Sequence, residues 1–151
     1  MVSRMEIDRS GMEVLARDVS LRLLETVPVG RVVVSERALP VAFPVNFALL
    51  DGDVVFRTST GSKLGAAVHK AVLAFEADRI DPDLCQGWSV LVQGWASLMT
   101  RPDELARAEA LGLHSWAPTT RGHFVRIHAE MVSGRRLLGA PATALSGAGR
   151  G

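Results

Sequence analysis

The chain has 151 residues, a formal net charge of +1 and an apolar share of 48%, so its length fits one domain with a core of its own. The near-zero charge excludes the electrostatic field that drives binding to nucleic acid or acidic membranes, and no apolar stretch is long enough to span a bilayer. Cys85 is the sole cysteine. That excludes an internal disulfide and, with an N-terminus that lacks the apolar core of a signal peptide, predicts a cytoplasmic protein.

The apolar share and the mean hydropathy of +0.20 are high for a small protein that must also cover itself with polar surface. A second buried apolar surface would account for this. A symmetric homodimer is its commonest form, and a bound planar cofactor would bury some apolar surface as well.

The first third of the chain begins with a weak signal over residues 1–17, which we expect to be loosely ordered or helical. Asp18 or Ser20 could cap a short helix that continues to Val27. The β-branched run within residues 31–36 then predicts a strand.

A β-hairpin is the clearest local prediction. From residue 41 to residue 49 large apolar side chains alternate with small or polar ones, which is the period of a half-buried strand. Asp51-Gly52 suits a tight turn with positive φ, and residues 54–58 form the second strand.

The rest of the chain alternates strands with short helices. We expect a helix over 63–69 capped by Ser62, a strand over 71–77, a polar loop over 78–86, a strand over 88–99, a helix from Pro102 that ends before Gly112, and a final strand over 123–130. The Gly- and Ala-rich residues 139–151 predict a flexible tail after a domain of residues 1–138. About six mostly antiparallel strands around one core imply a mainly β protein, a small barrel with short flanking helices.

The stretch from Arg57 to Lys63 is a candidate phosphate site. It leaves a strand, turns on a glycine and enters a helix, so backbone N–H groups can face an anion. Arg57 and Lys63 add positive charge, and Thr58 and Ser62 add hydroxyl donors. The alternative is a capped helix with two solvated cations.

The second candidate is Pro44-Val45-Asn46. A proline cannot donate to a strand ladder, so it marks an edge or a bulge where backbone groups can face a ligand. Asn46 shares its strand face with small residues, where a flat ring could fit. The alternative is an edge strand with a solvated Asn46.

The remaining reactive side chains give weaker signals. Trp116 and Arg121 lie in a loop before the last strand, a position suited to ring contact or to subunit packing. No histidine or cysteine has partners at metal-ligand spacing, so we predict no metal site.

Six segments in order resemble one known family. They are Gly30-Arg31-Val32-Val33, Phe43-Pro44-Val45-Asn46-Phe47, Val55-Phe56-Arg57-Thr58 with Gly61-Ser62-Lys63-Leu64, Gly87-Trp88-Ser89-Val90, Trp116-x-Pro118-x-x-Arg121-x-His123-Phe124, and Ser133-Gly134-Arg135-Arg136. Together they resemble the pyridoxamine 5′-phosphate oxidase-like superfamily of FMN-binding split barrels, in particular its short actinobacterial members.

The resemblance implies a six-stranded antiparallel split β-barrel that forms a homodimer with cofactor sites at the interface. Its motifs imply that Pro44, Val45 and Asn46 line the flavin ring, and that Arg57 and Thr58 approach the ring or the phosphate. The remaining implied contacts are Ser62 and Lys63 at the phosphate, Ser89 as a polar contact, and Trp116 and Arg121 from the partner. The substrate signature that ends the vitamin B6 oxidases is absent, so we do not expect a B6 vitamer as substrate.

Several functions remain open after the resemblance. The first is an FMN-dependent oxidoreductase, or flavin reductase-like protein, acting on a small molecule. The same barrel could use the deazaflavin cofactor F420, although its acidic tail would call for more basic residues than the sequence neighbourhood of Arg57 and Lys63 offers. A non-catalytic flavin- or haem-binding protein, with His69 or His114 as haem ligand, and an empty structural barrel are the other hypotheses.

Overall fold

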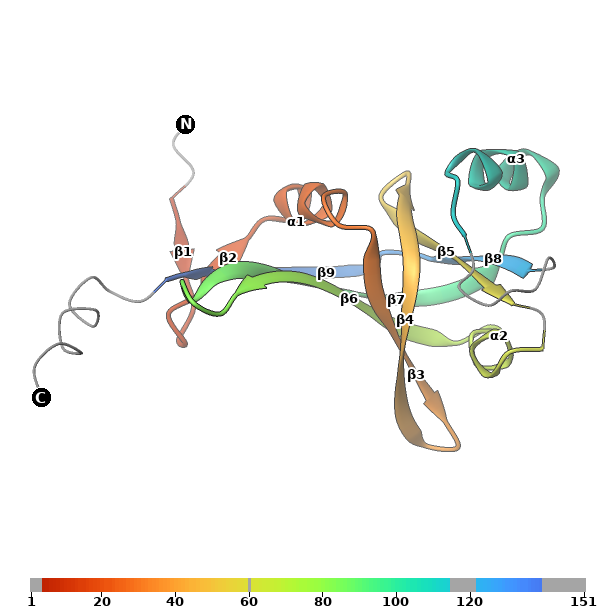
Figure 1. Cartoon of the computed structure of the whole chain (residues 1–151), viewed down its shortest axis with the longest axis horizontal. Coiled ribbons are helices and arrows are strands. Elements are labelled where there is room, and N and C mark those ends of the chain that lie inside the picture. The colour runs from red at the N-terminus through yellow and green to blue at the C-terminus, as the bar shows by residue number, and fades with distance from the viewer. Residues whose placement is uncertain (1–3, 60, 115–121, 140–151) are drawn as a thin grey trace, which may run out of the picture.

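The computed structural model describes residues 4–59, 61–114 and 122–139. They form one antiparallel sheet and three helices (Figure 1). The strands are β1 (Glu6–Ile7), β2 (Glu13–Leu15), β3 (Val29–Glu36), β4 (Leu39–Leu50), β5 (Asp53–Ser59), β6 (Val72–Asp81), β7 (Gln86–Leu98), β8 (Gly122–Ile127) and β9 (Met131–Leu138). The helices are α1 (Arg17–Leu24), α2 (Lys63–Ala67) and α3 (Pro102–Ala110).

Six of the strands close into a ring. The sheet order is β1-β2-β9-β7-β6-β3-β4-β5-β8, and a further pairing of β7 with β8 joins the ends of the six-strand part. Strand β7 has two partners along one edge: its residues 86–93 pair with β9, and its residues 96–98 pair with β8. The structure therefore confirms the predicted mainly β, six-stranded antiparallel split barrel.

Gly94 sits where β7 changes partner. A Cβ atom on this residue would overlap the backbone carbonyl of His128, so only glycine allows the two chain segments to approach this closely. The amide of His128 in turn donates to the carbonyl of Trp95 at 2.9 Å. Closure of the ring at β7 therefore requires glycine at position 94.

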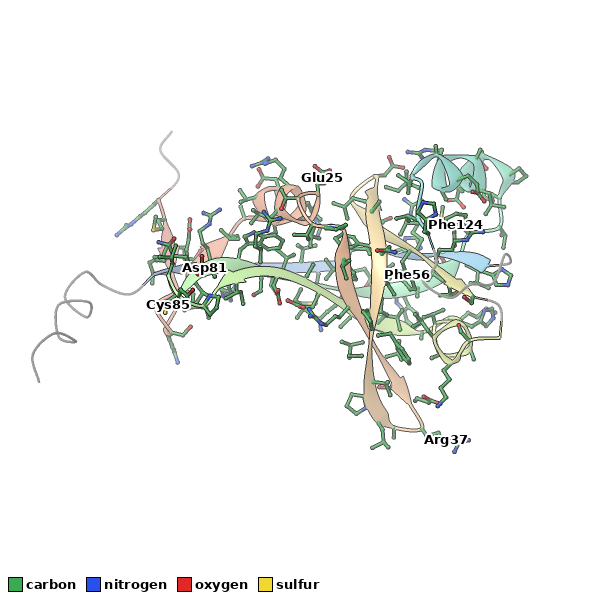
Figure 2. All side chains as sticks on the ribbon, viewed as in Figure 1. Glu25, Arg37, Phe56, Asp81, Cys85 and Phe124 are labelled. Atoms are coloured by element: carbon green, nitrogen blue, oxygen red, sulfur yellow. The ribbon has the colours of Figure 1, made fainter. Side chains whose placement is uncertain are left out.

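The core fills the ring from the predicted strand faces. Val45 and Phe47 of β4 are buried as the period-two pattern predicts, and Phe47 packs on Phe75 of β6 with ring centroids 4.6 Å apart. Phe56, labelled in Figure 2, is fully buried and belongs to the same core cluster. The turn at Asp51-Gly52 has φ of 53° and 80°, so the β4–β5 hairpin is confirmed.

Strands β6, β7 and β9 extend beyond the ring as a blade that α1 covers on one face (Figure 1). Here the prediction of a polar loop over 78–86 was wrong, because β6 runs to Asp81 and only residues 82–85 form the turn. The Asp81 carboxylate accepts from the backbone N–H groups of Asp83 and Leu84 at 3.0 and 3.1 Å, which tightens this turn.

The N-terminal and C-terminal predictions also need correction. Residues 6–7 and 13–15 form strands β1 and β2 instead of a helix or loose chain, and β9 follows β8 as a strand that was not predicted. Neither Asp18 nor Ser20 caps α1; the N-cap is Ala16, and the buried Ser20 hydroxyl donates to the Ala16 carbonyl at 2.9 Å. Gly134 of β9 permits this packing, since a Cβ there would overlap the Ser20 hydroxyl.

None of the helices in the described ranges is long and apolar enough to cross a membrane. Apart from Gly139, the predicted tail lies outside the described residues.

Candidate functional site

Two neighbouring strands separate at the centre of the predicted site. Strands β4 and β5 pair only between Phe47–Leu50 and Asp53–Phe56. Beyond that point β4 continues with β3, and residues 57–59 of β5 continue with β8. The separation leaves a groove of about 150 Å³, which we call the splay groove. Its lining residues are Phe43, Pro44, Val45, Asn46, Arg57, Thr58, Ser59, Ser62, Leu64 and His114.

The β4 edge of the splay groove presents backbone groups. Phe47 donates its N–H to Pro28 at 3.2 Å, on the β3 side. Backbone directions alternate along an antiparallel strand, so the backbone groups of Pro44 and Asn46 point toward the groove. Proline has no N–H, and position 44 therefore offers an acceptor there without leaving a donor unpaired.

A hydroxyl without a partner lies at the α2 end of the groove. Thr58 is only 3% exposed, and its Oγ1 atom has no hydrogen-bond partner among the described residues. Ser62 lies beside it and caps α2 as predicted, accepting from the Gly65 N–H at 2.9 Å. A Cβ on Gly65 would lie 3.1 Å from the Ser62 hydroxyl and 3.6 Å from Thr58 Oγ1. Both hydroxyls therefore lie close to Gly65, at the α2 end of the groove.

Two further contacts hold side chains that line the splay groove. The Asn46 amide donates to the backbone carbonyl of His114 at 3.1 Å, which ties β4 to the segment after α3. The Arg57 guanidinium lies over the Phe124 ring, 5.2 Å from its centroid. This stacking holds the guanidinium on the β8 side of β5.

A second, larger cavity of about 530 Å³ lies on the other side of Ser62. Lys63 lines this cavity together with Arg37, from the β3–β4 turn that Figure 2 labels at the tip of the hairpin. The cavity also carries the Glu36 carboxylate. Ser62 lines both cavities, so the two are neighbours on either side of this residue.

A family model described as pyridoxamine 5′-phosphate oxidase matches residues 16–136. This chain belongs to that family. The pyridoxamine 5′-phosphate oxidase-family chain is 40% identical over 143 residues to an uncharacterized protein of Mycobacterium tuberculosis, Rv0080, covering 90% of this chain and 93% of the relative.

Solved structures of similar proteins support the same assignment. The FAD binding protein from Mycobacterium smegmatis is 35% identical, with a TM-score of 0.72 over 82% of this chain and 97% of that one. A FAD and heme binding protein from the same organism is 20% identical, with a TM-score of 0.67 over 90% of this chain and 79% of that one. At that identity the second likeness shows the shared fold alone.

The structure of this chain brings six of the ten predicted site residues together in the splay groove: Pro44, Val45, Asn46, Arg57, Thr58 and Ser62. Lys63 lies in the adjoining cavity instead. Ser89 does not line the groove of its own chain; it stands in the blade, in register with Asp78 and Arg135. Trp116 and Arg121 lie outside the described residues.

Sequence reasoning did not assign Leu64 to the pocket that the structure shows, and it named His114 only as a candidate haem ligand. Leu64 could have been found as the apolar residue that follows Lys63 in the first turn of α2. His114 had no local signal, because its place depends on the path of the chain after α3. Within the described ranges, no group of three His, Cys, Asp or Glu residues could hold a metal ion.

Proposed function

We propose that this chain binds a flavin through its phosphate ester in the splay groove and acts as an oxidoreductase on a small molecule. The unpartnered Thr58 hydroxyl carries the proposal. A buried hydroxyl without a hydrogen bond costs about 1–3 kcal/mol, and a phosphate oxygen beside Ser62 would accept from it. Arg57, at the edge of the groove, supplies the positive charge that such a phosphate requires.

The flavin ring would lie along the β4 edge, where Pro44 and Asn46 offer backbone groups. A bound flavin supplies hydride or electron transfer, and the protein supplies orientation and electrostatics. Asn46 is held by His114 and Arg57 by its stacking on Phe124, so both side chains are positioned before the ligand arrives. The chemistry then needs no acid–base pair in the groove.

FMN is the cofactor that the splay groove by itself supports, because it carries a single phosphate. The adjoining cavity favours a second candidate. Lys63 and Arg37 line a space of about 530 Å³ beyond Ser62, which suits a cofactor with a further anionic group. FAD, bound by the similar protein from M. smegmatis, and F420 both have one.

Haem is a third candidate, supported by His114. This residue lines the splay groove, whereas His69 lies in the exposed turn after α2 and lines neither cavity around Ser62. A bound haem would give a protein that carries or senses its ligand without turnover.

We further propose a cytoplasmic homodimer in which a second copy completes the site. Ligand pockets usually have volumes of about 300–1,000 Å³, so a groove of about 150 Å³ encloses only part of a flavin. Val72 and Trp95 form a cross-strand pair on the outer face of the sheet and are 60% and 52% exposed, and Met131 nearby is 66% exposed. Such a patch is typical of a surface that another subunit covers.

The visible spectrum of the purified protein and the mass of its released ligand test these assignments. We expect the released ligand to be a flavin. Release of haem or F420 would favour the corresponding alternative, and a colourless protein that takes up none of the three would refute the proposal. Arg57→Ala should weaken FMN and FAD binding alike, by about 1.5–3 kcal/mol. Lys63→Ala should weaken FAD binding more than FMN binding if the second cavity holds the longer cofactor. Oxidation of NAD(P)H with an added electron acceptor then separates an enzyme from a carrier.

A further inference from the structure

A third cavity, of about 430 Å³, lies on the blade, away from the ring that holds the splay groove. Figure 2 labels Asp81 and Cys85 at the blade tip, at the opposite end of the molecule from Phe124. We call this cavity the blade groove. Its volume falls within the range of about 300–1,000 Å³ that is common for small-molecule sites.

The floor of the blade groove is a cross-strand row of three residues. Arg79 of β6 stands opposite Trp88 of β7, and Trp88 stands opposite Arg136 of β9. Directly opposed residues share one face of a sheet, so Trp88 stands between the two arginines on that face. Trp88 is 8% exposed and belongs to the core, so only an edge of the indole is open to the groove.

The walls of the blade groove are apolar and remain uncovered. Leu84 from the β6–β7 turn and Leu138 at the end of β9 line it and are 60% and 46% exposed. Gly87 holds the floor in place: a Cβ there would overlap the Arg79 carbonyl and lie 2.7 Å from the Ile80 Cα. The two strands can therefore approach closely beneath the indole.

Among the described residues, only one of the two arginines has an ion-pair partner. Arg136 forms an ion pair with Glu13 at 2.8 Å. Arg79 makes only a 3.4 Å hydrogen bond to the Thr26 carbonyl and forms no ion pair with any residue that the structure describes. The Asp81 carboxylate, which also lines the groove, accepts from the N–H groups of its own turn. The groove thus combines an apolar body with a cation, Arg79, that forms no ion pair with the described residues, and with the Asp81 carboxylate in the same lining.

We propose that the blade groove binds a small organic anion: a flat apolar body between Leu84 and Leu138, against the open edge of Trp88, with a carboxylate on Arg79. An aromatic carboxylate matches both features, since an aromatic ring can pack edge-to-face with the indole and a guanidinium donates two parallel hydrogen bonds to a carboxylate. The proposal does not depend on the flavin assignment, because the two cavities share no residue.

Titration of the full-length protein with 2-naphthoate tests the site, with binding followed by calorimetry and by the indole N–H signals in ¹H–¹⁵N NMR spectra. Trp95→Phe and Trp116→Phe variants assign these signals. We expect saturable binding that shifts the Trp88 signal. Arg79→Ala should weaken it at least about tenfold, the equivalent of about 1.4 kcal/mol, and Leu84→Gln should weaken it too. Arg31→Ala, an arginine of the outer sheet face that also pairs with acidic neighbours, should leave it unchanged.

Three results would overturn the proposal. One is the absence of a Trp88 shift at millimolar 2-naphthoate, and another is equal affinity in Arg79→Ala. The third is a Trp88 signal that moves with protein concentration alone, because a second copy of the chain would then cover the blade groove.

Discussion

Replacing Thr58 by Val should affect the empty protein and the flavin complex in opposite directions. The side chain is 3% exposed and its hydroxyl has no partner in the described part of the chain. Val keeps the shape and removes the hydroxyl, so the empty protein should lose none of its stability and could gain about 1 kcal/mol, the low end of the cost of an unsatisfied buried hydroxyl. The flavin complex should lose one charge-assisted hydrogen bond, worth about 1.5–3 kcal/mol, or roughly 10- to 150-fold in affinity.

Urea unfolding of the flavin-free protein and a flavin fluorescence titration measure the two effects. Thr26→Val is the matched control, because the exposed Thr26 hydroxyl donates to the Leu23 carbonyl at 2.6 Å, away from the splay groove. This control should not change flavin affinity. A Thr58→Val protein that is less stable when empty and binds flavin normally would show that the hydroxyl has a structural partner and that the phosphate lies elsewhere.

Three further predictions concern the ring, the outer face and the dimer. Gly94→Ala should lower the free energy of unfolding by more than about 2 kcal/mol in urea, since its Cβ would overlap the His128 carbonyl; a loss below 1 kcal/mol would contradict the tight ring closure. Burial, followed by the hydrogen bond and charge of Asp78, raises the pKa of Glu76 from 4.5 to about 7. The folded state then binds this proton more tightly than the unfolded state, so the free energy of unfolding should fall as the pH rises from about 4.5 to 7. Urea unfolding at several pH values should show that Glu76→Gln flattens this slope. An unchanged slope would contradict the raised pKa of Glu76. Trp95→Arg should place a charge in the exposed patch and shift the protein toward monomer in light scattering, with weaker flavin binding; a dimer of wild-type affinity would exclude this face as the interface.

The local patterns of the sequence were enough to find the hairpin and most of the groove. The alternation in β4, the Asp51-Gly52 turn and the Ser62 cap are each specified by neighbours in the chain, and each is confirmed. The prediction of a loop over 78–86 was wrong because the polar residues of this segment suggested a solvent-exposed connection. In the structure, residues 78–81 continue β6 as one edge of a long two-stranded ladder.

Features that depend on distant partners could not be predicted. Ser133 and Gly134 of strand β9 have low intrinsic preference for β-structure. The position of this strand depends instead on its pairing with β7 and on the close packing of Ser20 against Gly134. Lys63 and Ser62 are neighbours in sequence, yet Lys63 lines only the second cavity whereas Ser62 lines both. The orientation of the first turn of α2 decides this, and no pattern in the sequence reports it.

Pro44 disfavours renewed pairing of the two diverging strands. If β4 and β5 continued their ladder past Phe47 and Phe56, the backbone at position 44 would have to donate to β5, and proline has no hydrogen to give. A ladder that closed the splay groove would therefore lack one hydrogen bond at this position. For the same reason a strand from a neighbouring molecule finds an incomplete template along this edge, which lowers the aggregation hazard of the open groove.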